Sequence, residues 1–247
     1  MKRADLSRFF SRFSARRWVL IALIPTLFTV NWIWQAIVKP SELIGLLEAG
    51  YYKDPRNTWQ AFGPLFREHS TPIITPELLA ALSQAESRGN PIARTYWRWR
   101  WSLNPFAIYA PASSAVGLLQ ITDGTFAMAR QYCIHGNRVA RDGDWWDSRN
   151  CWFNSLYSRV VPSHAIEMTS AYLHVTVTKI AGGRPLAPST WHDLAAITHL
   201  CGPGIAESYL RRGMRFTKTS YCDAHNPQRY LKQIRELIQK FKKMPQA

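Results

Sequence analysis

Acidic residues are scarce in this sequence. Only 16 Asp and Glu stand against 31 Lys and Arg, which gives a formal net charge of +15 over 247 residues. A charge of this sign is typical of proteins that meet polyanions, such as nucleic acid, anionic lipid headgroups or an acidic cell wall. Charge alone does not choose among these. The length and a hydrophobic content of 47% allow one good-sized domain and an additional segment.

Signatures of metal and nucleotide binding are missing. The seven histidines are scattered and show no His-x-x-x-His spacing, and the sequence contains no P-loop and no dinucleotide-binding fingerprint. None of the four cysteines forms a Cys-x-x-Cys pair, which argues against a zinc ribbon or a thioredoxin-type site. We therefore expect neither a metal nor a cofactor.

The cysteines are few and lie late in the chain, at Cys133, Cys151, Cys201 and Cys222. An even number is typical of disulfide pairing in an oxidising compartment. Four cysteines allow three connectivities, of which we favour the local one, Cys133–Cys151 with Cys201–Cys222. Each bridge would close a loop of about 20 residues and stabilise the fold by roughly 3 kcal/mol in the chain-entropy view. Free buried thiols remain the alternative.

A basic N-terminal tail precedes a mostly apolar stretch. Residues 1–17 carry six Lys and Arg, and residues 18–38 form a run of about 21 residues, roughly 30 Å as a helix. Asn31 and Gln35 weaken its second half. We expect an uncleaved transmembrane signal anchor, with the tail in the cytoplasm and the rest of the chain outside. A cleaved signal peptide is the alternative.

The remaining sequence divides into a connecting region, 39–74, and a domain, 75–242. In the first, Ser41–Ala49 predicts a short helix, and prolines at 55, 64 and 72 interrupt any longer element. In the second, helical patterns occur without hairpin signals and without an internal repeat. The class is therefore predicted to be mainly α, with little or no sheet. The expected helices cover 75–88, 125–132, 163–180, 190–200, 205–212 and 227–241.

Glu86 stands out within the first of these helices. Leu78, Leu82 and Glu86 are spaced four residues apart and share one helix face. A carboxylate on an apolar stripe is costly unless it is paired or protonated. We expect burial to raise its pKa, as a general acid working near neutral pH requires.

Two motifs surround this residue. The first reads Glu-Ser-x-Gly-Asn-Pro from Glu86, and the second is a small-residue turn at Ser113 and Ser114 that leads to Gly-Leu-Leu-Gln at residues 117–120. Together they resemble the SLT-type lytic transglycosylase family. The resemblance implies a lysozyme-like fold and cleavage of the glycan strands of bacterial peptidoglycan.

Two further motifs resemble the family less closely. The Gly-Pro-Gly turn at 202–204 is kept, but His199 and Leu200 stand where the family commonly has Tyr and Asn. His199 either contacts the glycan or is a core histidine. Tyr230, near the start of the last helix, matches a family tyrosine that reaches the catalytic glutamate, or it is simply a packed aromatic residue.

The resemblance implies that one carboxylate suffices. Glu86 would protonate the leaving oxygen and then act as base for the sugar's C6 hydroxyl, which closes a 1,6-anhydro ring. Candidates for a second acid, Asp123, Asp142 and Asp144, are weak. The implied substrate contacts are Ser87, Ser113, Ser114, Gly117, Gln120, His199 and Tyr230.

Other interpretations remain open. A lysozyme-like muramidase would use water, and a catalytically silent peptidoglycan-binding or secretion scaffold could share the fold. The Arg- and Trp-rich run at 94–101 would suit sugar rings or a membrane surface, and its tryptophans could equally lie in the core. We expect a single-pass inner-membrane protein with its domain in the periplasm, bound to peptidoglycan and not to nucleic acid; any envelope-assembly partners are unknown.

Overall fold

A computed structural model describes residues 15–38, 53–141, 143, 146–147, 150–151, 153–217, 222 and 225–245, without the side chains of 15–17, 20 and 38. The expected helix at 41–49 and the residues Asp142 and Asp144 lie outside this part. The chain divides into two compact units. Unit 1 comprises residues 1–44 and 96–112, and unit 2 comprises residues 45–95 and 113–247. Each unit is described by itself.

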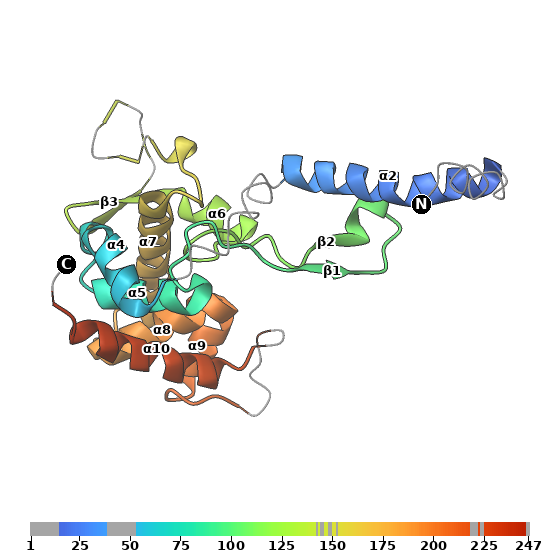
Figure 1. The fold of residues 1–247 in the computed structure, drawn as a ribbon. Coiled ribbons are helices and arrows are strands. Elements are labelled where there is room, and N and C mark those ends of the chain that lie inside the picture. The colour runs from blue at the N-terminus through green and yellow to red at the C-terminus, as the bar shows by residue number, and fades with distance from the viewer. Residues whose placement is uncertain are drawn as a thin grey trace. The chain divides into compact units, whose positions relative to one another are not determined.

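In its described residues, 15–38 and 96–112, unit 1 shows one long helix and a small hairpin (Figure 1). Helix α2 spans Ala15–Val38. Strands β1 (Trp97–Trp99) and β2 (Tyr109–Pro111) pair antiparallel, and the 3₁₀ turn η2 (Pro105–Ala107) lies between them. The hairpin is thus an insertion in the sequence of unit 2 that packs with the N-terminal helix.

The membrane-spanning helix expected at 18–38 is not supported. A helix forms there, but in the part of the chain that the structure describes no helix combines the length and the apolarity needed to cross a bilayer. Polar residues reduce the apolarity of α2. They include Thr26 and Thr29, as well as Asn31 and Gln35, whose side-chain amides turn to the hairpin.

Unit 2 begins earlier than the sequence predicts. Helix α4 (Pro55–Glu68) runs through Gly63-Pro64, where we expected a break. Asp54 caps it by accepting hydrogen bonds from two backbone amides, and Pro55 occupies its first turn, where a missing N–H costs nothing. Trp59, Phe62 and Phe66 bury one face of α4 against the rest of the unit. This packing makes part of the predicted connecting region a part of the domain core.

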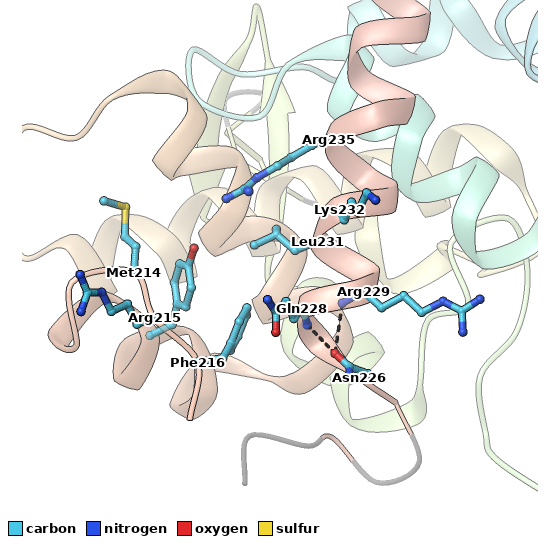
Figure 2. Close-up of a pocket in the computed structure, with 10 residues that line it drawn as sticks. Met214, Arg215, Phe216, Asn226, Gln228, Arg229, Leu231, Lys232 and Arg235 are labelled. Carbon is cyan, nitrogen blue, oxygen red and sulfur yellow. Dashed lines mark hydrogen bonds between the residues drawn. The ribbon is translucent and has the colours of Figure 1, made fainter. Parts of the chain in front are cut away.

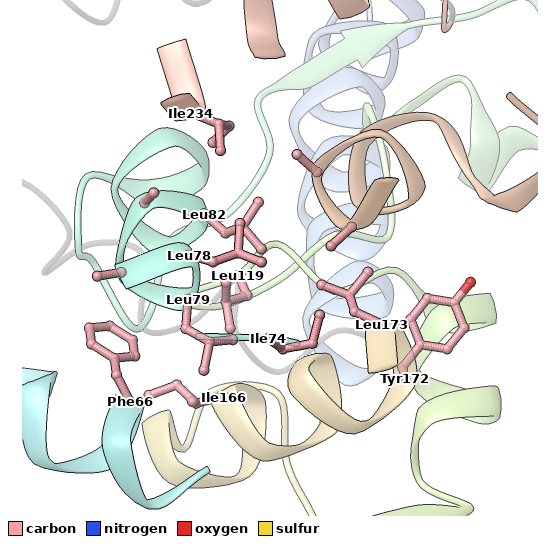
Figure 3. Close-up of a cluster of buried hydrophobic side chains, with 14 of the residues drawn as sticks. Phe66, Ile74, Leu78, Leu79, Leu82, Leu119, Ile166, Tyr172, Leu173 and Ile234 are labelled. Atoms are coloured by element: carbon pink, nitrogen blue, oxygen red, sulfur yellow. The ribbon is translucent and has the colours of Figure 1, made fainter. Parts of the chain in front are cut away.

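Helix α5 (Pro76–Ser87) lies at the centre of the core (Figure 3). Thr75 caps its first turn, as predicted, and Leu78, Leu79 and Leu82 are fully buried. The C-terminal helix α10 (Pro227–Lys242) packs along α5 and contributes Ile234 to the same cluster. The helix that carries Glu86 is therefore held by apolar contacts on several sides.

The described part of unit 2 contains four further helices: α6 (Asp123–Ala129), α7 (Pro162–Ala181), α8 (Pro188–Cys201) and α9 (Pro203–Arg211). Each matches an expected helix within a few residues, and the mainly helical class is confirmed. Helix α8 differs at its start, because it begins two residues before Thr190, with Ala187 at the capping position.

A second hairpin was missed. Strands β3 (Tyr132–His135) and β4 (Arg138–Arg141) pair antiparallel around Gly136 and Asn137, both of which have positive φ. Two such residues are the requirement of a tight type I′ turn, so the Gly-Asn dipeptide was an available signal. A 3₁₀ turn, η3 (Asn154–Leu156), follows.

The predicted cysteine pairing is confirmed. Cys133 pairs with Cys151 and Cys201 with Cys222, with Cα atoms 5.4 Å and 5.1 Å apart. The first bridge ties β3 to the segment before η3. The second joins the end of α8 to the segment that leads into α10.

Candidate active site

Glu86 lies on the last turn of α5, with its side chain 18% exposed. The Tyr230 hydroxyl, on the first turn of α10, donates a hydrogen bond of 2.5 Å to Glu86 Oε1. Burial and the neighbouring carboxylate raise the pKa of the Tyr230 hydroxyl well above its ordinary value of 10.0. Tyr230 therefore keeps its proton and stays a hydrogen-bond donor to Glu86.

His199 approaches the same carboxylate oxygen. Its Nε2 lies 3.9 Å from Glu86 Oε1, and its side chain is 7% exposed. It stands on the last turn of α8, two residues before Cys201. The structure thus brings together two of the predicted contact residues, one from each of two helices, at Glu86.

The segment 117–120 forms a tight turn beside α5. Gly117 has φ +84°, and a Cβ at this position would collide with the carbonyl oxygen of Arg159. Leu118 and Leu119 are fully buried. Gln120 also has a positive φ, and its Nε2 donates to the carbonyls of Ala93 (3.0 Å) and Gly117 (2.9 Å). The turn is fixed by glycine geometry, burial and amide hydrogen bonds.

Ser87 links this turn to helix α5. It is buried, and its hydroxyl lies 2.7 Å from the carbonyl of Leu118 and 3.0 Å from that of Ser83. Both neighbours are hydrogen-bond acceptors, so the Ser87 hydroxyl donates its hydrogen bond to a protein carbonyl. A contact from Ser87 to substrate stays a prediction.

The two serines before the turn have structural partners. Ser113 Oγ accepts a hydrogen bond from the amide of Ala115, and Ser114 Oγ accepts one from the amide of Asp123. Asp123 is one of the candidate second acids and follows this turn in the sequence. It forms an ion pair of 2.8 Å with Arg159.

Arg159 was missed by the sequence analysis. Its Nη1 donates to the carbonyls of Ser114 (2.9 Å) and Ile121 (3.0 Å), in addition to its ion pair with Asp123. One guanidinium therefore holds both ends of the segment that contains Gly117 to Gln120. A lone arginine outside any motif gives no sequence signal for such a role.

The buried carboxylate of Glu167 on α7 has a different environment from that of Glu86. It accepts hydrogen bonds from the Ile134 amide (2.7 Å) and the Tyr157 hydroxyl (2.6 Å) and lies 3.9 Å from His69. None of these groups is a partner of Glu86. Glu167 thus joins β3 and α4 to α7, and Glu86 has a tyrosine and a histidine as its recorded partners.

A basic hollow lies on another face of α10 (Figure 2). Its volume is about 760 Å³, and Glu86 does not line it. Arg235, on its wall, reaches back to Asp193 of α8 with two hydrogen bonds of 2.9 Å and 2.5 Å. This pair fixes α10 against α8, the two helices that carry Tyr230 and His199.

The profile of the transglycosylase SLT domain matches residues 64–220, well over half of the chain. The chain belongs to this family. The match includes Glu86, the 117–120 turn and His199, and it ends before Tyr230. The chain matches no curated protein and no solved structure. For a transglycosylase SLT domain, the arrangement of one partly buried glutamate beside a rigid glycine turn is consistent with an action on peptidoglycan.

Proposed function

We propose that this chain is a peptidoglycan lytic transglycosylase that cleaves the β-1,4 bond between MurNAc and GlcNAc. The observation that carries the proposal is the Glu86–Tyr230 hydrogen bond on a family-matched scaffold. Protonated Glu86 gives its proton to the glycosidic oxygen, and the C1–O bond breaks. The resulting carboxylate then takes the proton of the C6 hydroxyl as that oxygen bonds to C1. The product is a 1,6-anhydro-MurNAc end, and no water is consumed.

A single acid suits this cycle because the nucleophile belongs to the substrate. An inverting hydrolase needs a second carboxylate to activate water, and a retaining one needs it as nucleophile. Asp123 forms an ion pair with Arg159. Glu167 accepts hydrogen bonds from the Ile134 amide and the Tyr157 hydroxyl. Among the residues that the structure describes, which exclude Asp142 and Asp144, these interactions favour the transglycosylase over the muramidase.

The test is digestion of purified sacculi by the full chain, with mass analysis of the fragments. We expect anhydro ends, lighter than reducing ends by one water. Reducing ends would instead establish a muramidase. Glu86→Gln keeps the size and the hydrogen-bonding capacity of the side chain and should lower the rate by about 10²- to 10⁴-fold.

The control for Glu86→Gln is Glu207→Gln, on the exposed face of α9, where the carboxylate forms only a long pair with Arg211. This variant should digest sacculi as the wild type does. Unchanged digestion by a folded Glu86→Gln variant would overturn the assignment. Binding without digestion by the wild type would favour a silent peptidoglycan-binding protein.

We also propose that the domain acts outside the cytoplasm. Two cystine bridges support this location, because cytosolic thiols are normally kept reduced. The test is alkylation of the protein in intact cells with a maleimide that adds mass. Cysteines that react only after reduction support the proposal, and freely reactive cysteines contradict it.

A further inference from the structure

Unit 1 exposes an unusual amount of apolar surface. On α2, Val19, Ile24 and Ile37 are each more than 60% exposed, and the apolar side chains from 21 to 30 are exposed throughout. On the hairpin side, Trp101 and Leu103 are fully exposed. Exposed apolar surface of this extent is normally covered by protein or lipid, because it is costly in water.

The polar side chains in α2 are arranged for an apolar medium. The hydroxyls of Thr26 and Thr29 donate to helix carbonyls one turn earlier, both at 2.8 Å. Asn31 Nδ2 donates to the Tyr109 carbonyl (2.7 Å), and Gln35 Nε2 donates to the Phe106 carbonyl (2.6 Å). Asn31 Oδ1 is buried and has no hydrogen-bond partner among the described residues. Such internal pairing matters most where water is absent.

Aromatic rings complete the docking of the hairpin onto α2. Phe28 lies edge-on to Trp99 at 5.6 Å between ring centroids, and Trp34 lies 5.3 Å from Phe106. The amide hydrogen bonds therefore belong to a packed contact. The two residues that most weaken the apolar run, Asn31 and Gln35, are the ones that bind the hairpin.

The positive charge and the tryptophans of the hairpin favour a lipid surface with anionic headgroups as its partner. Residues 96–112 contain Arg98 and Arg100 and no acidic residue, and both arginines are exposed beside Trp99 and Trp101. Tryptophan favours the lipid headgroup boundary, and arginine is attracted to anionic headgroups.

We propose that α2 and the 96–112 hairpin form one lipid-binding element that enters an anionic phospholipid bilayer together. The helix supplies apolar surface, and the hairpin covers its two amides and places tryptophan and arginine at the headgroups. The element enters the lipid and does not need to cross it. The hairpin continues at Ser113 directly into the segment that contains the Gly117 turn, and its other end follows Thr95 of unit 2. The lipid-binding element is therefore joined to unit 2 through both ends of the hairpin, in addition to the connection through residues 39–52.

The test uses the full chain with Leu103→Cys labelled by a polarity-sensitive fluorophore. The control label is at Gln239→Cys, on the exposed side of α10. Vesicles of phosphatidylcholine with phosphatidylglycerol should shift the Leu103 label to the blue, and nitroxide-labelled lipids should quench it. The Gln239 label should stay unchanged. Vesicles of phosphatidylcholine alone should give a weaker effect.

Two double variants test the coupling. Asn31→Leu with Gln35→Leu removes both hydrogen bonds to the hairpin, and Thr26→Leu with Thr29→Leu makes α2 similarly more apolar without touching the hairpin. Both should still float with vesicles. The first should lose most of the quenching at residue 103, and the second should keep it.

Three results would overturn the proposal: a label at 103 that stays in water while the chain floats, quenching unaffected by Asn31→Leu with Gln35→Leu, or a label shielded without vesicles as the chain self-associates. The last would assign the surface to a second copy of this chain. Digestion of sacculi is a separate readout, so these failures leave the proposed enzyme function standing.

Discussion

Tyr230 supplies Glu86 with a hydrogen bond from a hydroxyl that does not ionise in the working range, because burial and the carboxylate raise its pKa. Tyr230→Phe removes the bond and keeps the ring. A hydrogen bond to a charged group contributes about 1.5–3 kcal/mol, so kcat for sacculus digestion should fall roughly 10- to 100-fold. KM should change little. Tyr96→Phe, an exposed tyrosine in the hairpin sequence, is the matched control.

Tyr230 would lose its assigned role if Tyr230→Phe retained the full kcat. It would have only a structural role if kcat fell in proportion to the folded fraction. Circular dichroism on the same preparations separates these outcomes.

Gly117 and Gly124 form a second contrasting pair of residues. A Cβ at Gly117 would meet the Arg159 carbonyl, and φ is +84°, whereas Gly124 lies in α6 with nothing within 4 Å of its Cβ position. Gly117→Ala should lower the free energy of unfolding by about 1–3 kcal/mol. Gly124→Ala should raise it by up to about 1 kcal/mol, since alanine suits a helix better. Urea denaturation measures both, and equal effects would contradict the geometry.

At the scale of elements, the two disulfides close loops of similar length and serve different places. Cys201–Cys222 connects the end of α8, near His199, with the approach to α10, near Tyr230; Cys133–Cys151 lies in the β3 region. Replacing either pair by serine should lower the free energy of unfolding by about 3 kcal/mol.

The two disulfides should differ in their effect on kcat. Loss of Cys201–Cys222 should lower kcat at a temperature where the chain is still folded, because His199 and Tyr230 then lose a covalent link. Loss of Cys133–Cys151 should leave kcat close to that of the wild type. The same kcat for both variants would show that the second bridge does not position the site.

Most helices could be predicted because their signals are local. Thr75-Pro76 starts α5, and Gly182 ends α7 in the left-handed conformation. Helix α4 could not, because Gly63-Pro64 is a poor helical sequence and burial of Trp59, Phe62 and Phe66 outweighs it. Within the site, motif spacing indicated Glu86 and the Gly117 turn. The role of Arg159 depends on contacts about 40 residues apart in sequence, which no local pattern records.

At the scale of the whole molecule, buried and half-buried histidines make stability sensitive to acid. Burial lowers the pKa of His69, His174 and His192 below the ordinary value of 6.5. The unfolded chain therefore binds more protons than the folded chain once the pH falls below about 6.5. Stability should be fully present above that pH and should decrease as the pH falls toward the lowered values.

Urea denaturation at neutral pH and at mildly acidic pH measures this loss. His174→Gln, which keeps a polar partner for Thr71, should show a shallower loss than the wild type. A wild-type protein equally stable at both pH values would contradict the prediction.

The Cys201–Cys222 bridge has a consequence for the life of the protein before it reaches its substrate. A newly made chain in a reducing cytosol has no sulfur link between the segments that carry His199 and Tyr230. Under the proposed function, the site would therefore reach its full activity only after an oxidant joins the two cysteines. Such an enzyme would have lower activity in the cytosol, and disulfide formation would activate it in the compartment that contains its substrate.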